Sequence, residues 1–233
     1  MDRLRIGLMI PRDNTTMEAE LLRWLPGGTQ CSTVRIPRGK MLLAAGDVPD
    51  FVAHSMRLAE ALAEGLDNAP LDIVVYGCAA VGILAGPRQD AELTAALSDT
   101  TGRPVISAAA AMVAALQHAD ASDIALVTPY SEAVNERLTE FLFDGEINVR
   151  RISSFGAATV ERLARIDAKA VAGRALETMD ETCDAMFIAC SQLPTHSILA
   201  LLLREFQRPV LSSVQACAWR VRQQLELDHP RRH

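Results

Sequence analysis

The sequence predicts an α/β protein with two pseudo-symmetric Rossmann-like lobes, each built on a parallel sheet, and a site in the cleft between them. Short apolar runs alternate with longer helical stretches, which is the pattern of right-handed βαβ units. The apolar runs lack the regular polar alternation of half-exposed strands, so we expect them to be buried on both faces. An internal duplication favours two similar lobes over one large sheet.

The duplication consists of three pairs of segments that occur in the same order in both halves. Each half has a strand that ends in proline, then a strand that ends in cysteine, then a strand that follows Arg-Pro. The matching pairs are residues 6–11 with 124–129, residues 72–79 with 184–191, and residues 103–107 with 208–212. We therefore expect a first lobe of residues 1–118 and 214–233 and a second lobe of residues 119–213.

The individual elements follow from this alternation. The expected strands are residues 5–10, 73–76, 105–106, 124–127, 186–188 and 210–211. The expected helices are residues 17–24, 51–64, 91–98, 108–117, 132–143, 169–182, 197–206 and 214–227. In open parallel sheets the ligand binds beyond the carboxyl ends of the strands. Both duplicated cysteines and both duplicated prolines fall at such ends.

Composition excludes several classes of protein. The net charge of −6, from 29 acidic and 23 basic residues, is mild and disfavours a nucleic-acid-binding protein. No apolar run approaches the ~18 residues of a membrane span, and the first residues do not resemble a secretory signal. The five cysteines are widely spaced without a CxxC motif, so we expect no disulfide framework and a reducing, cytoplasmic location.

The two duplicated cysteines, Cys78 and Cys190, are the main candidates for chemistry. A thiol at a helix N-terminus feels the positive end of the backbone dipoles, so its pKa is expected to fall. Free backbone N–H groups at the same place can hold a carboxylate. Cysteine also packs well in cores, which is our expectation for Cys31, Cys183 and Cys217. Two cysteines at equivalent positions of a repeat instead favour one shared pocket.

Polar residues follow the first strand of each half. Asn14 and Thr15 lie where a helix is expected to begin, so they can cap that helix or present polar groups to a ligand. Tyr130 follows the equivalent strand of the second half and can either offer its hydroxyl to the pocket or pack on the next helix.

The sequence contains no convincing metal or nucleotide motif. His196 lies six residues after Cys190, so a Cys–His dyad remains an alternative to a surface or capping role for this histidine. No second pair completes a tetrahedral metal site, and the phosphate-binding glycine motifs are missing from the sequence. We therefore expect neither a metal nor a cofactor.

Several motifs resemble those of maleate cis–trans isomerases, in the aspartate/glutamate racemase superfamily. They are residues 5–20, the Tyr-Gly-Cys run that ends at Cys78, residues 125–130, and Cys-Ser-Gln-Leu-Pro at 190–194. The resemblance covers most of the chain and implies two α/β lobes with one cysteine from each. Residues 153–167 look more like the arylmalonate decarboxylases of the same branch, which carry a glycine at the position of Cys78.

The resemblance implies cofactor-independent isomerisation of a maleate-like unsaturated dicarboxylate. The thiolate of Cys78 is expected to add to the alkene, while Cys190 exchanges the proton at the neighbouring carbon. Rotation about the new single bond and elimination would then give the trans product. The substrate carboxylates would be held by Asn14, Thr15 and Tyr130 and by the backbone N–H groups of Ala79, Ala80, Val81, Gln192 and Leu193.

Two alternatives remain open from the sequence. The first is a racemase or an arylmalonate-type decarboxylase acting at a carbon next to a carboxylate, with Cys190 moving the proton. The second, which is not an enzyme, is a small-carboxylate binder that keeps the cleft without turnover. The expected partners are a small carboxylate substrate and, as an open alternative to a monomer, a second copy in a homodimer.

Overall fold

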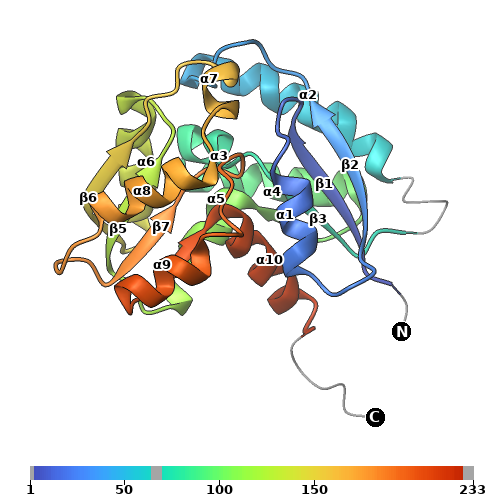
Figure 1. Cartoon of the computed structure of the whole chain (residues 1–233). Helices are drawn as coiled ribbons and strands as arrows, with labels where there is room; N and C mark the ends of the chain where they lie inside the picture. Colours follow the sequence, from blue (N-terminus) through green and yellow to red (C-terminus); the bar gives the residue numbers. More distant parts are fainter. Residues whose placement is uncertain (1–2, 64–69, 228–233) are drawn as a thin grey trace.

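Two four-stranded parallel sheets form the framework of the protein (Figure 1). The computed structural model describes residues 3–63 and 70–227. The first sheet has the order β2 (Gln30–Ile36), β1 (Arg5–Pro11), β3 (Ile73–Tyr76) and β4 (Val105–Ser107). The second has the order β6 (Asn148–Ser154), β5 (Asp123–Thr128), β7 (Ala185–Ile188) and β8 (Val210–Ser212). The two orders are equivalent under the duplication, so the predicted α/β fold with two parallel sheets is confirmed.

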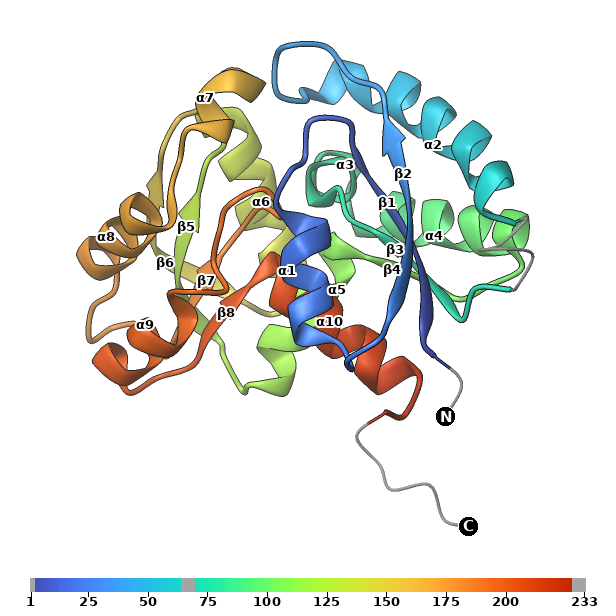
Figure 2. The same cartoon turned by 45° about the vertical axis from the view of Figure 1, so that its right-hand side comes forward.

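Helices cover the faces of both sheets. They are α1 (Met17–Trp24), α2 (Val48–Ala63), α3 (Ala79–Ala85), α4 (Pro87–Thr101), α5 (Ala108–His118), α6 (Glu132–Asp144), α7 (Val160–Ala164), α8 (Ala168–Thr178), α9 (Leu199–Phe206) and α10 (Ser213–Gln224), with a short 3₁₀ turn at Ala45–Asp47. Helices α5 and α10 pack on each other, and each contacts both β4 and β8, so they lie between the two sheets (Figure 2). None of the helices in the described residues is long and apolar enough to cross a membrane.

The strands at the centre of each sheet are fully buried. All four residues of β3 and all four of β7 are buried, and β1 is buried from its second residue onward. This is why their sequences are apolar without alternation. All six predicted strands are present.

The edge strands β2 and β6 were not predicted. Most residues of β2 are half-buried, and four of the seven residues of β6 are exposed. An edge strand of this kind carries Arg, Asn, Ser and Thr, so it lacks the apolar run by which the central strands were predicted. The short helices α3 and α7 were also missed.

Several predicted helices differ in extent from those observed. Helix α4 spans Pro87–Thr101, beyond both ends of the predicted 91–98, α9 begins at Leu199 and not at residue 197, and α10 ends at Gln224 and not at residue 227. Helix α8 ends at Thr178, not at residue 182, because Met179 has an extended backbone and the Asp180 carboxylate then accepts the N–H of Thr182 at 2.9 Å. Helix α2 begins at Val48, three residues before the predicted start, and residue 64 of the prediction lies outside the described residues.

The assignment of the last helix to the first lobe remains a proposal. Helix α10 follows β8 of the second sheet, yet it also contacts α1, α5 and β4. Residues 228–233, which the predicted lobe includes, lie outside the described residues, as do residues 1–2 and 64–69.

Candidate active site

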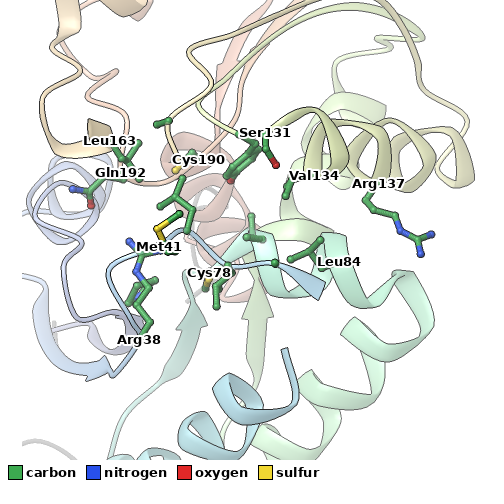
Figure 3. Close-up of a pocket in the computed structure, with 18 of the residues that line it drawn as sticks. Arg38, Met41, Cys78, Leu84, Ser131, Val134, Arg137, Leu163, Cys190 and Gln192 are labelled. Atoms are coloured by element: carbon green, nitrogen blue, oxygen red, sulfur yellow. The ribbon is translucent and has the colours of Figure 1, made fainter. Parts of the chain in front are cut away.

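A cavity of about 670 Å³ lies where the loops at the carboxyl ends of both sheets meet. Both duplicated cysteines line it, together with side chains from the two lobes (Figure 3). Of the residues predicted for the site, those that line the cavity are Asn14, Cys78, Ala79, Ala80, Tyr130, Cys190 and Gln192. Three others, Thr15, Val81 and Leu193, are not part of the lining.

Cys78 follows β3 and directly precedes α3. Burial raises the pKa of its thiol to about 12, although the Arg38 charge and the backbone N–H groups of Val81 and Ala80 act in the opposite direction. Charge on Cys190 raises the pKa of Cys78 further, so the two sulfur atoms lie within electrostatic reach of each other.

Cys190 follows β7 in a different backbone conformation. Its φ of 90° is in a region that non-glycine residues rarely adopt, and its N–H donates to the Ser213 hydroxyl at 3.0 Å. Burial raises the pKa of this thiol, against hydrogen bonds from the backbone N–H of Gln192 and from the Tyr130 hydroxyl.

The expectation of lowered thiol pKa values is therefore wrong for both cysteines. Backbone N–H groups do face the sulfurs and do lower their pKa values. Burial of an ionisable thiol is the larger effect, because the thiolate loses its hydration in the cavity wall. After Cys190 the chain forms turns instead of a helix, since Pro194 disfavours helical geometry at the residue before it.

Tyr130 is buried, and its hydroxyl lies beside the Cys190 sulfur. Burial raises the pKa of this phenol well above its ordinary value, as does negative charge on either cysteine. The hydroxyl therefore stays protonated and can donate a hydrogen bond, which agrees with the predicted place of Tyr130 at the pocket.

A chain of hydrogen bonds joins the two cysteine loops. The Asn14 side-chain amide donates to the Ser191 hydroxyl at 3.0 Å, and that hydroxyl donates to the Gly77 carbonyl at 2.8 Å. The Asn14 carbonyl oxygen accepts the N–H groups of Thr16 and Met17 at 3.1 and 2.9 Å, so Asn14 also caps α1 as predicted. These hydrogen bonds hold the segment before Cys78 against the segment after Cys190.

Thr15, Val81 and Leu193 have other roles in the structure. Thr15 is exposed, and its N–H donates to the Gln192 side chain at 3.1 Å. The Val81 and Leu193 side chains are buried in the core, while their N–H groups face the sulfurs of Cys78 and Cys190. Their backbone N–H groups also donate to the carbonyls of Cys78 and Cys190, at 3.3 and 3.2 Å.

Sequence reasoning missed the loops that follow the edge strands. Arg38 follows β2 and lines the cavity. The Leu42 N–H donates to the Ala158 carbonyl at 3.2 Å, and the Val160 N–H donates to the Lys40 carbonyl at 2.9 Å. Met41, Leu42 and Leu163 also line the cavity, so the loop after β2 and helix α7, which follows β6, contribute apolar side chains to its wall. Predicting β2 would have placed Arg38 at a strand end.

The alternative Cys190–His196 dyad receives no support. The His196 ring lies against Trp24, with ring centroids 4.9 Å apart, and is not part of the cavity lining. Its backbone N–H donates to the Glu20 carboxylate at 3.1 Å. Within residues 3–63 and 70–227, no cluster of three or more His, Cys, Asp or Glu side chains could hold a metal ion.

The fold and the site define a two-lobed α/β protein in which each lobe contributes one thiol to a shared cavity. The sequence model of the arylmalonate decarboxylase family matches residues 49–232. The chain therefore belongs to the arylmalonate decarboxylase and maleate isomerase family, within the aspartate/glutamate racemase superfamily. This is a family of enzymes that includes both maleate isomerases and arylmalonate decarboxylase.

Curated relatives of both kinds are similar to this chain. A maleate isomerase from Nocardia farcinica is 27% identical over 232 residues, covering 96% of this chain and 90% of the relative. An arylmalonate decarboxylase from Bordetella bronchiseptica is 28% identical over 190 residues, covering 74% of this chain and 78% of the relative.

Solved structures show the same fold. The Nocardia farcinica maleate cis–trans isomerase bound to Tris superposes with a TM-score of 0.87 at 24% identity, over 96% of this chain and 92% of the other. A cysteine-to-serine mutant of that enzyme carries a covalently bound succinylcysteine intermediate, and it superposes with a TM-score of 0.82 at 25% identity, over 96% and 93%.

Proposed function

We propose that this protein is a cofactor-independent cis–trans isomerase of a maleate-like unsaturated dicarboxylate. The observation that carries the proposal is the pair of thiols, Cys78 and Cys190, in the wall of one cavity. A thiolate is a soft nucleophile and suits addition to a conjugated alkene. The maleate isomerases that resemble the chain over 96% of its length support this assignment.

The proposed reaction begins once Cys78 has given its proton to water and become a thiolate, with Cys190 still a thiol. The Cys78 sulfur forms a bond to one alkene carbon, and the alkene electron pair moves to the other carbon, which takes the proton of Cys190. The carbon–carbon bond of the former alkene, which is now single, rotates. Cys190 then removes a proton from the same carbon, the double bond reforms, and Cys78 leaves as a thiolate. Every bond and proton is restored, so no co-reactant is consumed.

Carboxylate binding in this proposal uses hydrogen-bond donors around the sulfurs. Asn14 and Tyr130 supply an amide and a hydroxyl, and backbone N–H groups near Ala79 and Gln192 supply further donors. We also propose that a thiolate at Cys78 is stabilised by the N–H groups of Ala80 and Val81, which oppose the effect of burial. Thr15 supports this wall indirectly, through its hydrogen bond with Gln192.

The first test is the conversion of maleate to fumarate, followed by ultraviolet absorbance and identified by NMR. We expect the Cys78→Gly variant to lose isomerase activity on the order of 10³-fold or more, because no nucleophile remains to form the adduct. Cys31→Ser is the matched control, since Cys31 does not line the cavity and should leave the rate unchanged. A folded wild-type protein that releases no fumarate would contradict the proposal.

A second candidate function is decarboxylation or racemisation at a carbon next to a carboxylate. It is favoured by the family match and by the apolar side chains of Met41, Leu42 and Leu163, which suit an apolar substituent on the substrate. In that reaction Cys190 would protonate an enolate-like intermediate. Carbon dioxide release from phenylmalonate that survives Cys78→Gly, while maleate is not converted, would favour this alternative.

A further inference from the structure

Within residues 3–63 and 70–227, Arg38 is the one charged residue of the cavity lining that is not exposed. Its side chain is only 8% exposed, although it belongs to a loop at the molecular surface. The other charged residues of the lining are Glu136, Arg137 and Glu140, all of which lie on α6 and are exposed. Arg137 and Glu140 also neutralise each other in an ion pair of 2.9 Å.

The Arg38 guanidinium is held at one end and open at the other. Its Nε donates to the Asp13 carboxylate at 2.8 Å, and among the described residues this is the single hydrogen bond of the side chain. In residues 3–63 and 70–227, the buried side-chain nitrogen and oxygen atoms without a hydrogen-bond partner belong to four other side chains and not to Arg38. The two terminal nitrogens of Arg38 are therefore not fully buried. Since Arg38 lines the cavity, they can donate hydrogen bonds into it.

Asp13 pairs with the Arg38 charge from outside the cavity lining. Asp13 is not part of the lining, and it lies on the loop after β1, where the Gln192 side chain donates to its carbonyl at 3.2 Å. The ion pair thus joins the loops that follow the neighbouring strands β1 and β2. A guanidinium fixed at Nε presents its other donors in the fork that binds a carboxylate with two hydrogen bonds.

We propose that Arg38 binds one carboxylate of the ligand in the cavity and that Asp13 is the positioning residue that holds it there. The assignment deepens the proposed isomerase function by naming a carboxylate-binding group, but the binding step does not depend on turnover. Arg38 also opposes the raised pKa values of Cys78, Cys190 and Tyr130, so its charge reaches each reactive group. Figure 3 shows Arg38, Gln192 and both cysteines around the same cavity.

The test uses Arg38→Met and two readouts that do not require catalysis. The first is protection of Cys78 and Cys190 from iodoacetamide by succinate, a saturated dicarboxylate, with each thiol followed by mass spectrometry. We expect succinate to bind about 10- to 100-fold more weakly to Arg38→Met, which is the loss typical of charge-assisted hydrogen bonds. The second readout is the rate of Cys78 alkylation by anionic iodoacetate relative to neutral iodoacetamide, which should fall in the same variant.

Three further variants make the result specific. Arg88→Met removes an exposed arginine whose partner is Glu92, 3.9 Å away, and should leave both readouts unchanged. Arg38→Lys keeps the charge without the fork, so it should restore most of the iodoacetate preference but only part of the succinate affinity. Asp13→Asn should weaken succinate binding less than Arg38→Met, because the charge of Arg38 remains and the neutral amide oxygen at position 13 holds it less firmly than a carboxylate does. A thermal melt of each variant excludes loss of the fold.

Equal succinate protection and an equal reagent ratio in wild type and a folded Arg38→Met would overturn the role of Arg38. Lost protection in a protein that never converts maleate would leave Arg38 as the carboxylate anchor and overturn the proposed isomerase function instead. The two failures are therefore distinguishable.

Discussion

At the scale of single residues, Cys78 and Cys190 occupy equivalent positions of the duplicated chain but differ in conformation. Cys78 has an ordinary φ of −107°, whereas the φ of 90° at Cys190 costs on the order of 1–3 kcal/mol. Burial raises the pKa of both thiols, so both are protonated at neutral pH when the cavity holds no ligand. The nearby N–H groups and Arg38 then lower the cost of forming a thiolate.

We predict that iodoacetamide alkylation of Cys78 accelerates about tenfold per pH unit between pH 7 and pH 10. The thiolate is the reactive form, and a pKa raised to about 12 leaves it a small fraction that grows over this whole range. Rates for each cysteine can be measured by mass spectrometry of the alkylated peptides. A plateau at or below pH 8 would contradict the prediction.

Cys217 provides the internal control for this experiment. Burial raises the pKa of Cys217 to about 12 as well, but its side chain is fully buried in the core and does not line the cavity. Cys217 should therefore stay unmodified at every pH at which the protein remains folded.

At the scale of elements, α3 determines where the donors around Cys78 lie. This helix begins at Ala79 and contacts α5 in the same lobe and α6 across the cavity. Gly82 allows the close approach: a Cβ there would lie 2.8 Å from the Ala109 Cβ and 2.3 Å from a carboxylate oxygen of Asp90. Position 82 therefore has no room for a larger residue, and α3 cannot be moved without disturbing the site.

We predict that Gly82→Ala lowers the free energy of unfolding by about 1–3 kcal/mol, the usual cost of overpacking a core. Gly173→Ala is the matched control in α8, because a Cβ at Gly173 would meet no atom within 4 Å. That variant should be more stable than wild type by about 0.5–1 kcal/mol, since alanine favours the helix. Urea unfolding of both variants checks the pair, and equal stability of Gly82→Ala and wild type would contradict the packing argument.

At the scale of the whole molecule, the two sheets share one core and are joined by buried polar contacts. One apolar cluster runs from Ile6 in β1 through Val127 in β5 to Val221 in α10. The buried Glu20 carboxylate of α1 accepts the N–H groups of Thr195 and His196, at 2.8 and 3.1 Å, and the Thr195 hydroxyl. Glu20 thus links a helix of the first half to the loop after β7, near Cys190.

We predict that Glu20→Gln lowers the free energy of unfolding by about 1.5–3 kcal/mol. The carboxylate faces three donors, and the amide of glutamine replaces one of its oxygens with a fourth donor. Glu18→Gln is the control, because its ion pair with Arg35 is exposed and should contribute less than about 1 kcal/mol. Both variants are compared by urea unfolding, and equal losses would contradict a special role for Glu20.

The sequence by itself determined the duplication, the six central strands and the strand-end positions of the two cysteines. These follow from local patterns: apolar runs mark buried strands, and a repeat places equivalent residues at equivalent ends of two sheets. The same patterns did not reveal β2 and β6, because an edge strand keeps polar residues and so resembles a loop. Arg38 and Met41 follow β2, so without a prediction of β2 their position at the cavity was not predicted either.

Only the tertiary structure decided the protonation of the thiols and the charge in the cavity wall. The sequence predicted lowered pKa values from backbone N–H groups, which act over one turn of chain. Burial of Cys78 and Cys190 depends on side chains contributed by segments far apart in the sequence, and its effect is larger. Desolvation is a property of the assembled cavity, so no local motif specifies it.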